Sequence, residues 1–329
     1  MSPDDLLNDL RQRSILNDEQ RQRIAASERS RPFSLHWELR ALLYAGILLL
    51  SSGLGLLVYD NFDHVGHGIL LLIIAAACVV SFVFAWLNRP PWTTEQATSR
   101  SAFGAYALLL ACLLFLTLEG YAQYQYNVFG TRYGLVTFVP AMLFLALAYR
   151  FDHKGVLSMA LTALISWVGI TVRPLNFYFK TNFFDQKVVF SAIGLALVIG
   201  AVALVLERQR IKSHFTLTHL TFAGNLLLVA LLAGLFNFEG LLPWFMAGLA
   251  AGCWLADRYA RQEQRNRAGS FLFLLMSAVY GYIGLTYLYF KYLHPSGNAV
   301  AGYVYFIVSG IVLIAYLLYQ RRSVLHESI

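Results

Sequence analysis

The most constraining feature of this sequence is a series of apolar runs that each approach 20 residues. The run at residues 68–87 holds no charged residue. An α-helix needs about 20 apolar residues to cross roughly 30 Å of hydrocarbon. The 329 residues are 58% hydrophobic and 13% charged, whereas a soluble domain is about half apolar and about a quarter charged. The sequence therefore predicts an all-α, polytopic membrane protein embedded in a lipid bilayer.

Ten transmembrane helices can be drawn along the chain. The first 36 residues are polar and the first apolar run is full length, so a cleavable signal peptide is not expected. An even number of spans places both termini on one side of the membrane. The spans are expected at residues 37–58, 68–87, 102–121, 134–149, 155–172, 187–206, 215–236, 241–256, 269–290 and 299–319.

The basic residues indicate which side that is. With both termini inside, the 25 Lys and Arg divide into 20 on the inner side and five on the outer side. The positive-inside rule therefore predicts cytoplasmic termini in a bacterial inner membrane. The net charge of +7 then lies on the inner face, where it meets anionic lipid, and it does not indicate nucleic-acid binding. The five outer cations are Arg132, Arg173, Lys180, Lys187 and Lys291.

The chain divides into four segments by composition. Residues 1–35 are polar and predict a cytoplasmic amphipathic helical hairpin. This hairpin either lies on the bundle or the membrane surface, or it docks a protein partner or a second copy of the chain. Residues 36–101 form the first transmembrane hairpin and a cytoplasmic loop. Residues 102–214 and 215–329 form two four-span units, the second with a short cytoplasmic tail.

The two four-span units share short sequence matches. Residues 166–171 read SWVGIT and residues 281–286 read GYIGLT, 115 positions later. The pairs Glu119-Gly120 and Glu239-Gly240 end equivalent spans. Because four spans is an even number, the pattern predicts a parallel duplication with both copies in the same orientation. Chance similarity among apolar helices is the alternative.

Five polar side chains are candidates for ligand or ion binding. Glu119 and Glu239 lie near the outer boundary, and an ionisable residue at a span is a functional candidate. Arg132 and Arg173 are the outer cations nearest the spans, and they either pair with the acids or bind a phosphate or carboxylate. Asn225 lies near the middle of its span. The plainer alternatives are interfacial positioning, snorkelling to headgroups and interhelical hydrogen bonding.

The first outer loop holds the only metal-ligand pattern that we single out. Asp60, Asp63, His64 and His67 stand at i, i+3, i+4 and i+7, and carboxylate plus imidazole suits a divalent cation. A solvated outer loop is the alternative, and no other cofactor is expected. The sequence has no GxSxG, HExxH or P-loop motif, so no catalytic residue is assigned and an enzyme is not favoured.

Two stretches carry a family resemblance. Residues 6–28 read LLNDLRQRSILNDEQRQRIAASE, and residues 41–63 read ALLYAGILLLSSGLGLLVYDNFD. Both resemble domain-of-unknown-function family 2157, a group of bacterial predicted multi-pass membrane proteins. The resemblance implies a multi-pass membrane protein and implies no activity.

Three functional hypotheses follow. The first is a transporter- or channel-like module for a small solute, lipid or ion, in which Glu119 and Glu239 face a shared cavity open to the outside. The second is a membrane scaffold or sensor that acts through residues 1–35. The third is a metal-dependent membrane enzyme that uses the first outer loop.

Overall fold

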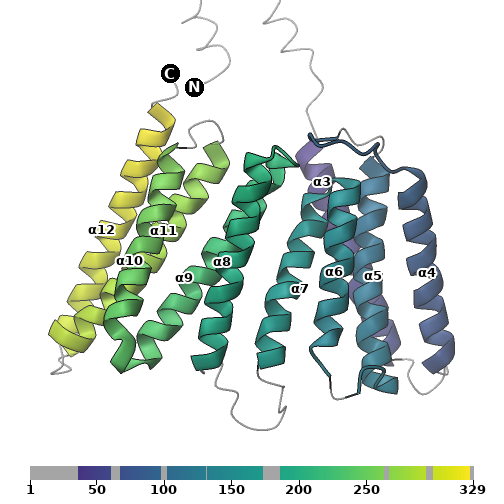
Figure 1. The fold of residues 1–329 in the computed structure, drawn as a ribbon, viewed down its shortest axis with the longest axis horizontal. Coiled ribbons are helices and arrows are strands. Elements are labelled where there is room, and N and C mark those ends of the chain that lie inside the picture. The colour runs from purple at the N-terminus through teal and green to yellow at the C-terminus, as the bar shows by residue number, and fades with distance from the viewer. Residues whose placement is uncertain are drawn as a thin grey trace, which may run out of the picture. The chain divides into compact units, whose positions relative to one another are not determined.

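The computed structural model describes residues 36–60, 67–97, 102–130, 132–172, 186–262, 267–293 and 299–326. The chain divides into two units, residues 1–57 and 58–329, and each is described by itself. All regular structure in the described residues is helical, with ten α-helices (Figure 1). These are α3 (His36–Asp60), α4 (His67–Leu87), α5 (Ala102–Tyr126), α6 (Leu135–Phe151), α7 (Lys154–Val172), α8 (Gln186–Arg208), α9 (Thr216–Asn237), α10 (Leu242–Gln262), α11 (Arg267–Leu288) and α12 (Ala299–His326).

The described part of the first unit lies on α3. Its large apolar side chains, such as Leu42 and Leu49, are mostly exposed, as expected for a helix that meets hydrocarbon. The Ser52 hydroxyl donates to the backbone carbonyl of Leu48, which satisfies a polar group inside an apolar helix.

Seven helices in the described part of the chain are long and apolar enough to span a membrane: α4, α5, α7, α8, α9, α11 and α12. The apolar parts of α3 and α6 are shorter. The last turns of α10 carry Asp257, Arg258 and Arg261, which limit its apolar length. The first residue of each of the ten predicted spans lies within about two residues of the first residue of a helix. Multiple apolar helices are therefore confirmed, whereas the crossing of all ten and their orientation stay predictions.

Within residues 58–329 the helices pack as antiparallel hairpins. The most extensive contacts join α4 to α5, α6 to α7, α8 to α9 and α10 to α11. The first three pairs close at one end, where residues 88–97, 152–153 and 209–215 lie, and we call this the hairpin end (Figure 1). Residues 127–130 and 238–241 lie at the opposite end, which we call the distal end.

Two apolar cores hold these hairpins together. Phe144, Leu108 and Leu157 are fully buried where α5, α6 and α7 meet. Leu235 and Leu274 are buried in a second core of α9, α10 and α11. Because lipid tails are as apolar as these side chains, close packing and not removal from water holds the helices together. The cores fix the end-to-end register that brings the hairpin-end loops together.

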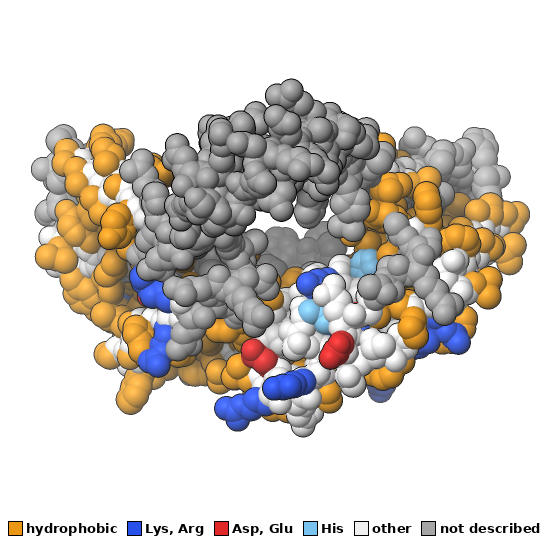
Figure 2. Space-filling model, turned by 90° about the horizontal axis from the view of Figure 1, so that it is seen from above, with side chains coloured by type: hydrophobic (Ala, Val, Ile, Leu, Met, Phe, Trp, Pro, Cys, Tyr) orange, Lys and Arg blue, Asp and Glu red, His pale blue; other side chains and the backbone are white. Residues whose placement is uncertain are grey.

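One glycine sets a close helix approach in the second core. A Cβ at Gly234 would lie 2.1 Å from the ring of Phe245, so α9 and α10 pack at a distance that only glycine allows. At the hairpin end, Lys and Arg, Asp and Glu, and His side chains gather among the helix ends, whereas the flanks are hydrophobic (Figure 2). This distribution is typical of helices whose sides meet hydrocarbon and whose ends meet water.

Candidate functional site

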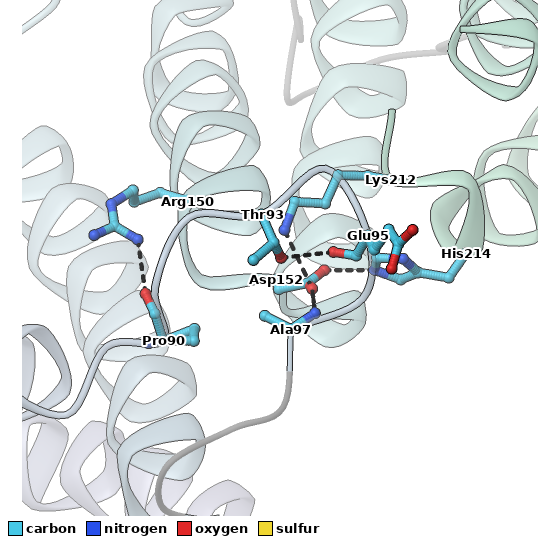
Figure 3. Close-up of polar contacts among 8 residues, drawn as sticks. All are labelled: Pro90, Thr93, Glu95, Ala97, Arg150, Asp152, Lys212 and His214. Carbon is cyan, nitrogen blue, oxygen red and sulfur yellow. Dashed lines mark hydrogen bonds and ion pairs between the residues drawn. The ribbon is translucent and has the colours of Figure 1, made fainter. Parts of the chain in front are cut away.

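The most connected polar site lies at the hairpin end and centres on Asp152. Asp152 follows α6 in the left-handed conformation (φ 57°), and its backbone N–H caps the helix by donating to Ala148 O. An Asp tolerates this conformation better than most residues. The turn aims the carboxylate inward, where it accepts hydrogen bonds from the backbone N–H of Ala97 (2.5 Å) and from His214 Nε2 (Figure 3).

Lys212 completes this site with a positive charge. Its Nζ lies 3.2 Å from Asp152 Oδ2, and the side chains of Lys212 and Asp152 are 1% and 2% exposed. The backbone N–H of Lys212 donates to Thr94 O (2.7 Å), and its ammonium lies 5.1 Å from the ring centroid of Trp92. Burial of two opposite charges is tolerated when they pair closely and have further polar or cation–π contacts, and Asp152 and Lys212 have both.

The cluster of Asp152, Lys212 and His214 therefore joins three segments that are distant in the sequence. Asp152 belongs to the α6–α7 corner, Lys212 and His214 to the α8–α9 connection, and Ala97 to the segment after α4 (Figure 3). The cavity beside Asp152 holds about 50 Å³, far below the roughly 300–1,000 Å³ of small-molecule sites. The cluster of Asp152, Lys212 and His214 therefore holds loops together and does not form a small-molecule site, and we call it the clamp.

His153 lies beside Asp152 and immediately precedes α7. Its Nδ1 accepts a hydrogen bond from the backbone N–H of Val156 (3.1 Å), which requires that nitrogen to be unprotonated. Burial lowers the pKa of the His153 imidazole to about 4. The residue is therefore neutral at physiological pH and acts as a helix cap.

A basic aromatic pocket of about 470 Å³ lies at the same end. The Arg89 and Arg150 guanidinium carbons lie 4.3 Å and 5.7 Å from the centroid of the Trp86 ring. Arg150 also donates to Pro90 O (3.1 Å) (Figure 3). Neither arginine forms an ion pair with a described residue, so the pocket carries positive charge suited to an anion.

An apolar groove of about 510 Å³ lies between α8, α9 and α10. Small residues such as Gly200, Gly224 and Gly252 are in its lining, and at Gly200 the nearest atom to an added Cβ is 3.9 Å away. Arg258 is in the lining, exposed, and 5.2 Å from the Trp254 ring centroid. Because these residues belong to the halves of α8, α9 and α10 nearest the hairpin end, the groove lies toward that end.

A second apolar groove of about 960 Å³ lies between α11 and α12. Two of its lining hydroxyls are paired with each other, since Tyr282 OH lies 3.0 Å from Ser309 Oγ. It offers a wide apolar surface with no charged residue in its lining.

The predicted outer acids lie in different environments. Glu119 on α5 is 9% exposed, and neither carboxylate oxygen has a hydrogen-bond partner among the described residues. Glu239 is 82% exposed and accepts a 2.8 Å hydrogen bond from Lys291 Nζ, which lowers the pKa of the Glu239 carboxyl. Glu119 is thus enclosed by protein, whereas Glu239 faces outward with a cationic partner.

Asn225 makes its contacts within the bundle. Its Oδ1 accepts from Tyr280 OH (3.0 Å) on α11, and its Nδ2 donates to the Thr221 carbonyl (3.1 Å). Nearby, His219 Nδ1 donates to Phe215 O, which leaves Nε2 to accept from Tyr149 OH at 3.3 Å. These contacts match the interhelical alternative for Asn225.

The remaining predicted residues are placed only in part. Arg132 is exposed, and Arg173 lies outside the described residues. For the metal hypothesis, Asp63 and His64 also lie outside them, as does the side chain of Asp60. His67 Nδ1 lies 2.8 Å from Tyr121 OH. Within the described part of the chain no group of three His, Cys, Asp or Glu is arranged to hold a metal ion.

Sequence reasoning missed the clamp. Asp152, Lys212 and His214 stand at no local spacing that indicates a site, because their contact depends on how the hairpins pack. The one available signal was their position at span ends, where charged residues are ordinary.

Residues 8–157 match the family model described as Predicted membrane protein (DUF2157). The match confirms the resemblance read from residues 6–28 and 41–63, and it reaches α6 and the start of α7. It includes Arg150 and Asp152 but ends before Lys212 and His214. No curated protein and no solved structure matches the chain.

Proposed function

We propose that the chain is a transporter-like membrane module that takes an anionic, lipid-like amphiphile from the bilayer into the groove between α8, α9 and α10. The observation that carries the proposal is an apolar groove of about 510 Å³ with a guanidinium, that of Arg258, in its lining. An amphiphile needs an apolar wall for its tail and a cation for its headgroup.

The pairing of the neighbouring charges supports Arg258 as the headgroup contact. Arg261 forms a two-toothed ion pair with Asp257, with N–O distances of 2.7 Å and 3.0 Å. Arg258 forms no ion pair with a described residue and lies in the groove lining. Two arginines one turn apart therefore differ in availability, and they form a matched pair for testing.

An ion or a polar solute fits the two apolar grooves less well than a lipid does. Both large grooves have mainly apolar linings, and Asn225 and Glu239 already have protein partners. The apolar tail of a lipid would contact these linings at no cost in hydration, whereas an ion or a polar solute would lose its hydration shell. Of the predicted substrates, the lipid is the one that this chemistry favours.

The proposal includes the predicted orientation and duplication. With the hairpin end cytoplasmic, Arg258 and the Arg89–Arg150 pocket would face the leaflet that carries anionic lipid. In α5–α8 and in α9–α12, the second and third helices pack most extensively, which supports two equivalent units. A plain series of hairpins gives the same packing, so the matches at residues 166–171 and 281–286 remain the main support.

The scaffold hypothesis rests on residues 1–35, which lie outside the described residues. Deleting those residues separates the two functions. A transporter-like module keeps lipid binding without them, whereas a scaffold loses its association with a partner or with itself.

The test is lipid retention by the purified full-length chain. The protein is placed in nanodiscs of equal phosphatidylglycerol and phosphatidylcholine, and native mass spectrometry counts the lipids that remain bound. We expect more phosphatidylglycerol than phosphatidylcholine to be retained. Arg258→Ala removes this preference and Arg261→Ala preserves it.

A second variant tests the tail site. At Gly200 the nearest atom to an added Cβ is 3.9 Å away, so Gly200→Leu fills the groove without a backbone clash. It is expected to lower retention of both lipids. Equal losses in Arg258→Ala and Arg261→Ala, or unchanged retention in Gly200→Leu, would contradict the proposal.

A further inference from the structure

Glu119 is a buried acid without a partner in the described structure. Its side chain is 9% exposed, and both of its oxygens lack a hydrogen bond to any described residue. An ionised carboxylate in such surroundings is costly, and the usual outcome is that the group takes up a proton. An acid of this kind within a span is a functional candidate.

The neighbours of Glu119 along its helix face set the direction of access. On the hairpin side, Phe115 stands one turn away and packs edge-on against Phe144, with ring centroids 6.1 Å apart. Leu108 and Cys112 continue the same face and are buried in the first core. These side chains form an apolar plug between Glu119 and the hairpin end.

On the distal side stands Gln123, one turn beyond Glu119 and also 9% exposed. Its Oε1 accepts from the backbone N–H of Phe129 (2.8 Å), and its Nε2 donates to Asn127 Oδ1 (2.9 Å) and to Gly130 O (3.3 Å). The Gln123 amide is therefore used to hold the turn at residues 127–130.

Among the described residues, the other titratable groups near the distal end form no hydrogen bond with Glu119. From α4 and α5, His67 and Tyr121 contact each other. Arg132 and Tyr133, which precede α6, are exposed. The described distal half of α7 carries no charged residue.

We propose that Glu119 is a proton-binding site that exchanges protons with the distal aqueous face past the Gln123-held turn and carries its proton in the resting protein. The plug of Phe115 and Phe144 separates the site from the hairpin end. The inference does not depend on the lipid groove, which lies on other helices.

The test uses dicyclohexylcarbodiimide, an apolar reagent that modifies protonated carboxyl groups within membranes. The carboxyl oxygen bonds to the central carbodiimide carbon while the carboxyl proton moves to a nitrogen. The resulting O-acylisourea rearranges to a stable N-acylurea without any leaving group. Mass spectrometry of peptides from the full-length chain in proteoliposomes locates the adduct.

We expect labelling at Glu119 at pH 7 and a fall of about tenfold per pH unit once the pH exceeds the titration point of the site. Glu239 is the internal control, because it is exposed and paired with Lys291. Glu119→Gln abolishes the adduct, whereas Glu239→Gln leaves it unchanged. The wild-type peptide map alone is decisive if Glu119→Gln fails to fold.

Two results would overturn the proposal. The first is no adduct at Glu119 in folded wild-type protein at any pH from 5 to 9. The second is an adduct that Na⁺ suppresses at constant pH, because this would make Glu119 a metal-cation ligand. Labelling that is insensitive to Na⁺ and falls with rising pH supports the proton site.

Discussion

Lys212 Nζ lies 3.2 Å from Asp152 Oδ2, and this ion pair is almost wholly buried. It ties the α8–α9 connection to the α6–α7 corner, and the Ala97 N–H adds the segment after α4. Buried ion pairs contribute little net stability over apolar replacements, but loss of one partner is costly. We interpret the pair as fixing one arrangement of the hairpin-end loops.

Removal of either charge should destabilise the fold unequally. Lys212→Met leaves Asp152 with His214 and the Ala97 N–H, whereas Asp152→Ala leaves the buried ammonium facing the Trp92 ring. We expect a loss of about 3–5 kcal/mol for Asp152→Ala and a smaller loss for Lys212→Met. Thermal or denaturant unfolding in detergent measures both.

The double variant Asp152→Ala with Lys212→Met is the control for this pair. It removes both charges together and should recover part of the loss seen in the single variants. Strictly additive losses would show that the two side chains do not interact in the folded protein.

Acid should destabilise the protein partly through His153. Its pKa is about 4 in the folded chain and about 6.5 when unfolded. Between these two pH values the unfolded chain binds more protons than the folded chain. The contribution of neutral His153 to the stability of the fold is therefore complete above about pH 6.5 and is lost as the pH falls toward 4. The shift corresponds to at most about 3 kcal/mol.

Comparison with His153→Gln isolates this effect from the carboxylates that titrate in the same range. A Gln side chain does not titrate, and its oxygen can accept the Val156 N–H. The wild type should lose stability faster than the variant from pH 7 to pH 4. Parallel stability curves would exclude His153 as a source of acid sensitivity.

Close packing of α9 on α10 predicts a sharp glycine effect. Gly234→Ala forces a methyl group into the Phe245 ring, and overpacking of this kind costs about 1–3 kcal/mol. Gly194→Ala is the matched control, because nothing lies within 4 Å of an added Cβ there. Unfolding midpoints of the two variants should differ clearly, and equal midpoints would contradict the packing of α9 against α10.

The hydrogen bond between Tyr280 and Asn225 should have a modest structural effect. Tyr280→Phe removes a single 3.0 Å contact between α9 and α11. Interhelical hydrogen bonds in membranes contribute about 0.6 kcal/mol on average and up to about 1.7 kcal/mol. Unfolding of the variant should shift within that range, whereas loss of lipid retention with unchanged stability would make Asn225 part of a binding path.

The helices could be predicted from the sequence because the length and apolar character of each run are local properties of the sequence. Helix ends were less predictable, since α5 and α10 continue into polar turns that carry Gln123 and Arg258. A helix can continue beyond the hydrocarbon region into polar residues, and the apolar run does not indicate how far.

The site was predictable only in part, because local context does not record tertiary surroundings. Glu119 and Glu239 stand in the same Glu-Gly context, yet one is enclosed and the other exposed. The buried pair of Asp152 and Lys212 left no motif, since two separate connections supply it. Burial and pairing depend on which helix faces meet.

The most direct test of the central claim is photo-crosslinking with an anionic lipid. Phosphatidylglycerol with a diazirine in its acyl chain is incorporated with the full-length chain into liposomes, irradiated, and mapped by peptide mass spectrometry. The account predicts adducts on the groove segments of α8, α9 and α10, which decline in Arg258→Ala and persist in Arg261→Ala. Adducts spread evenly over the exposed faces of α4 and α12, or equal yields with phosphatidylcholine, would contradict it.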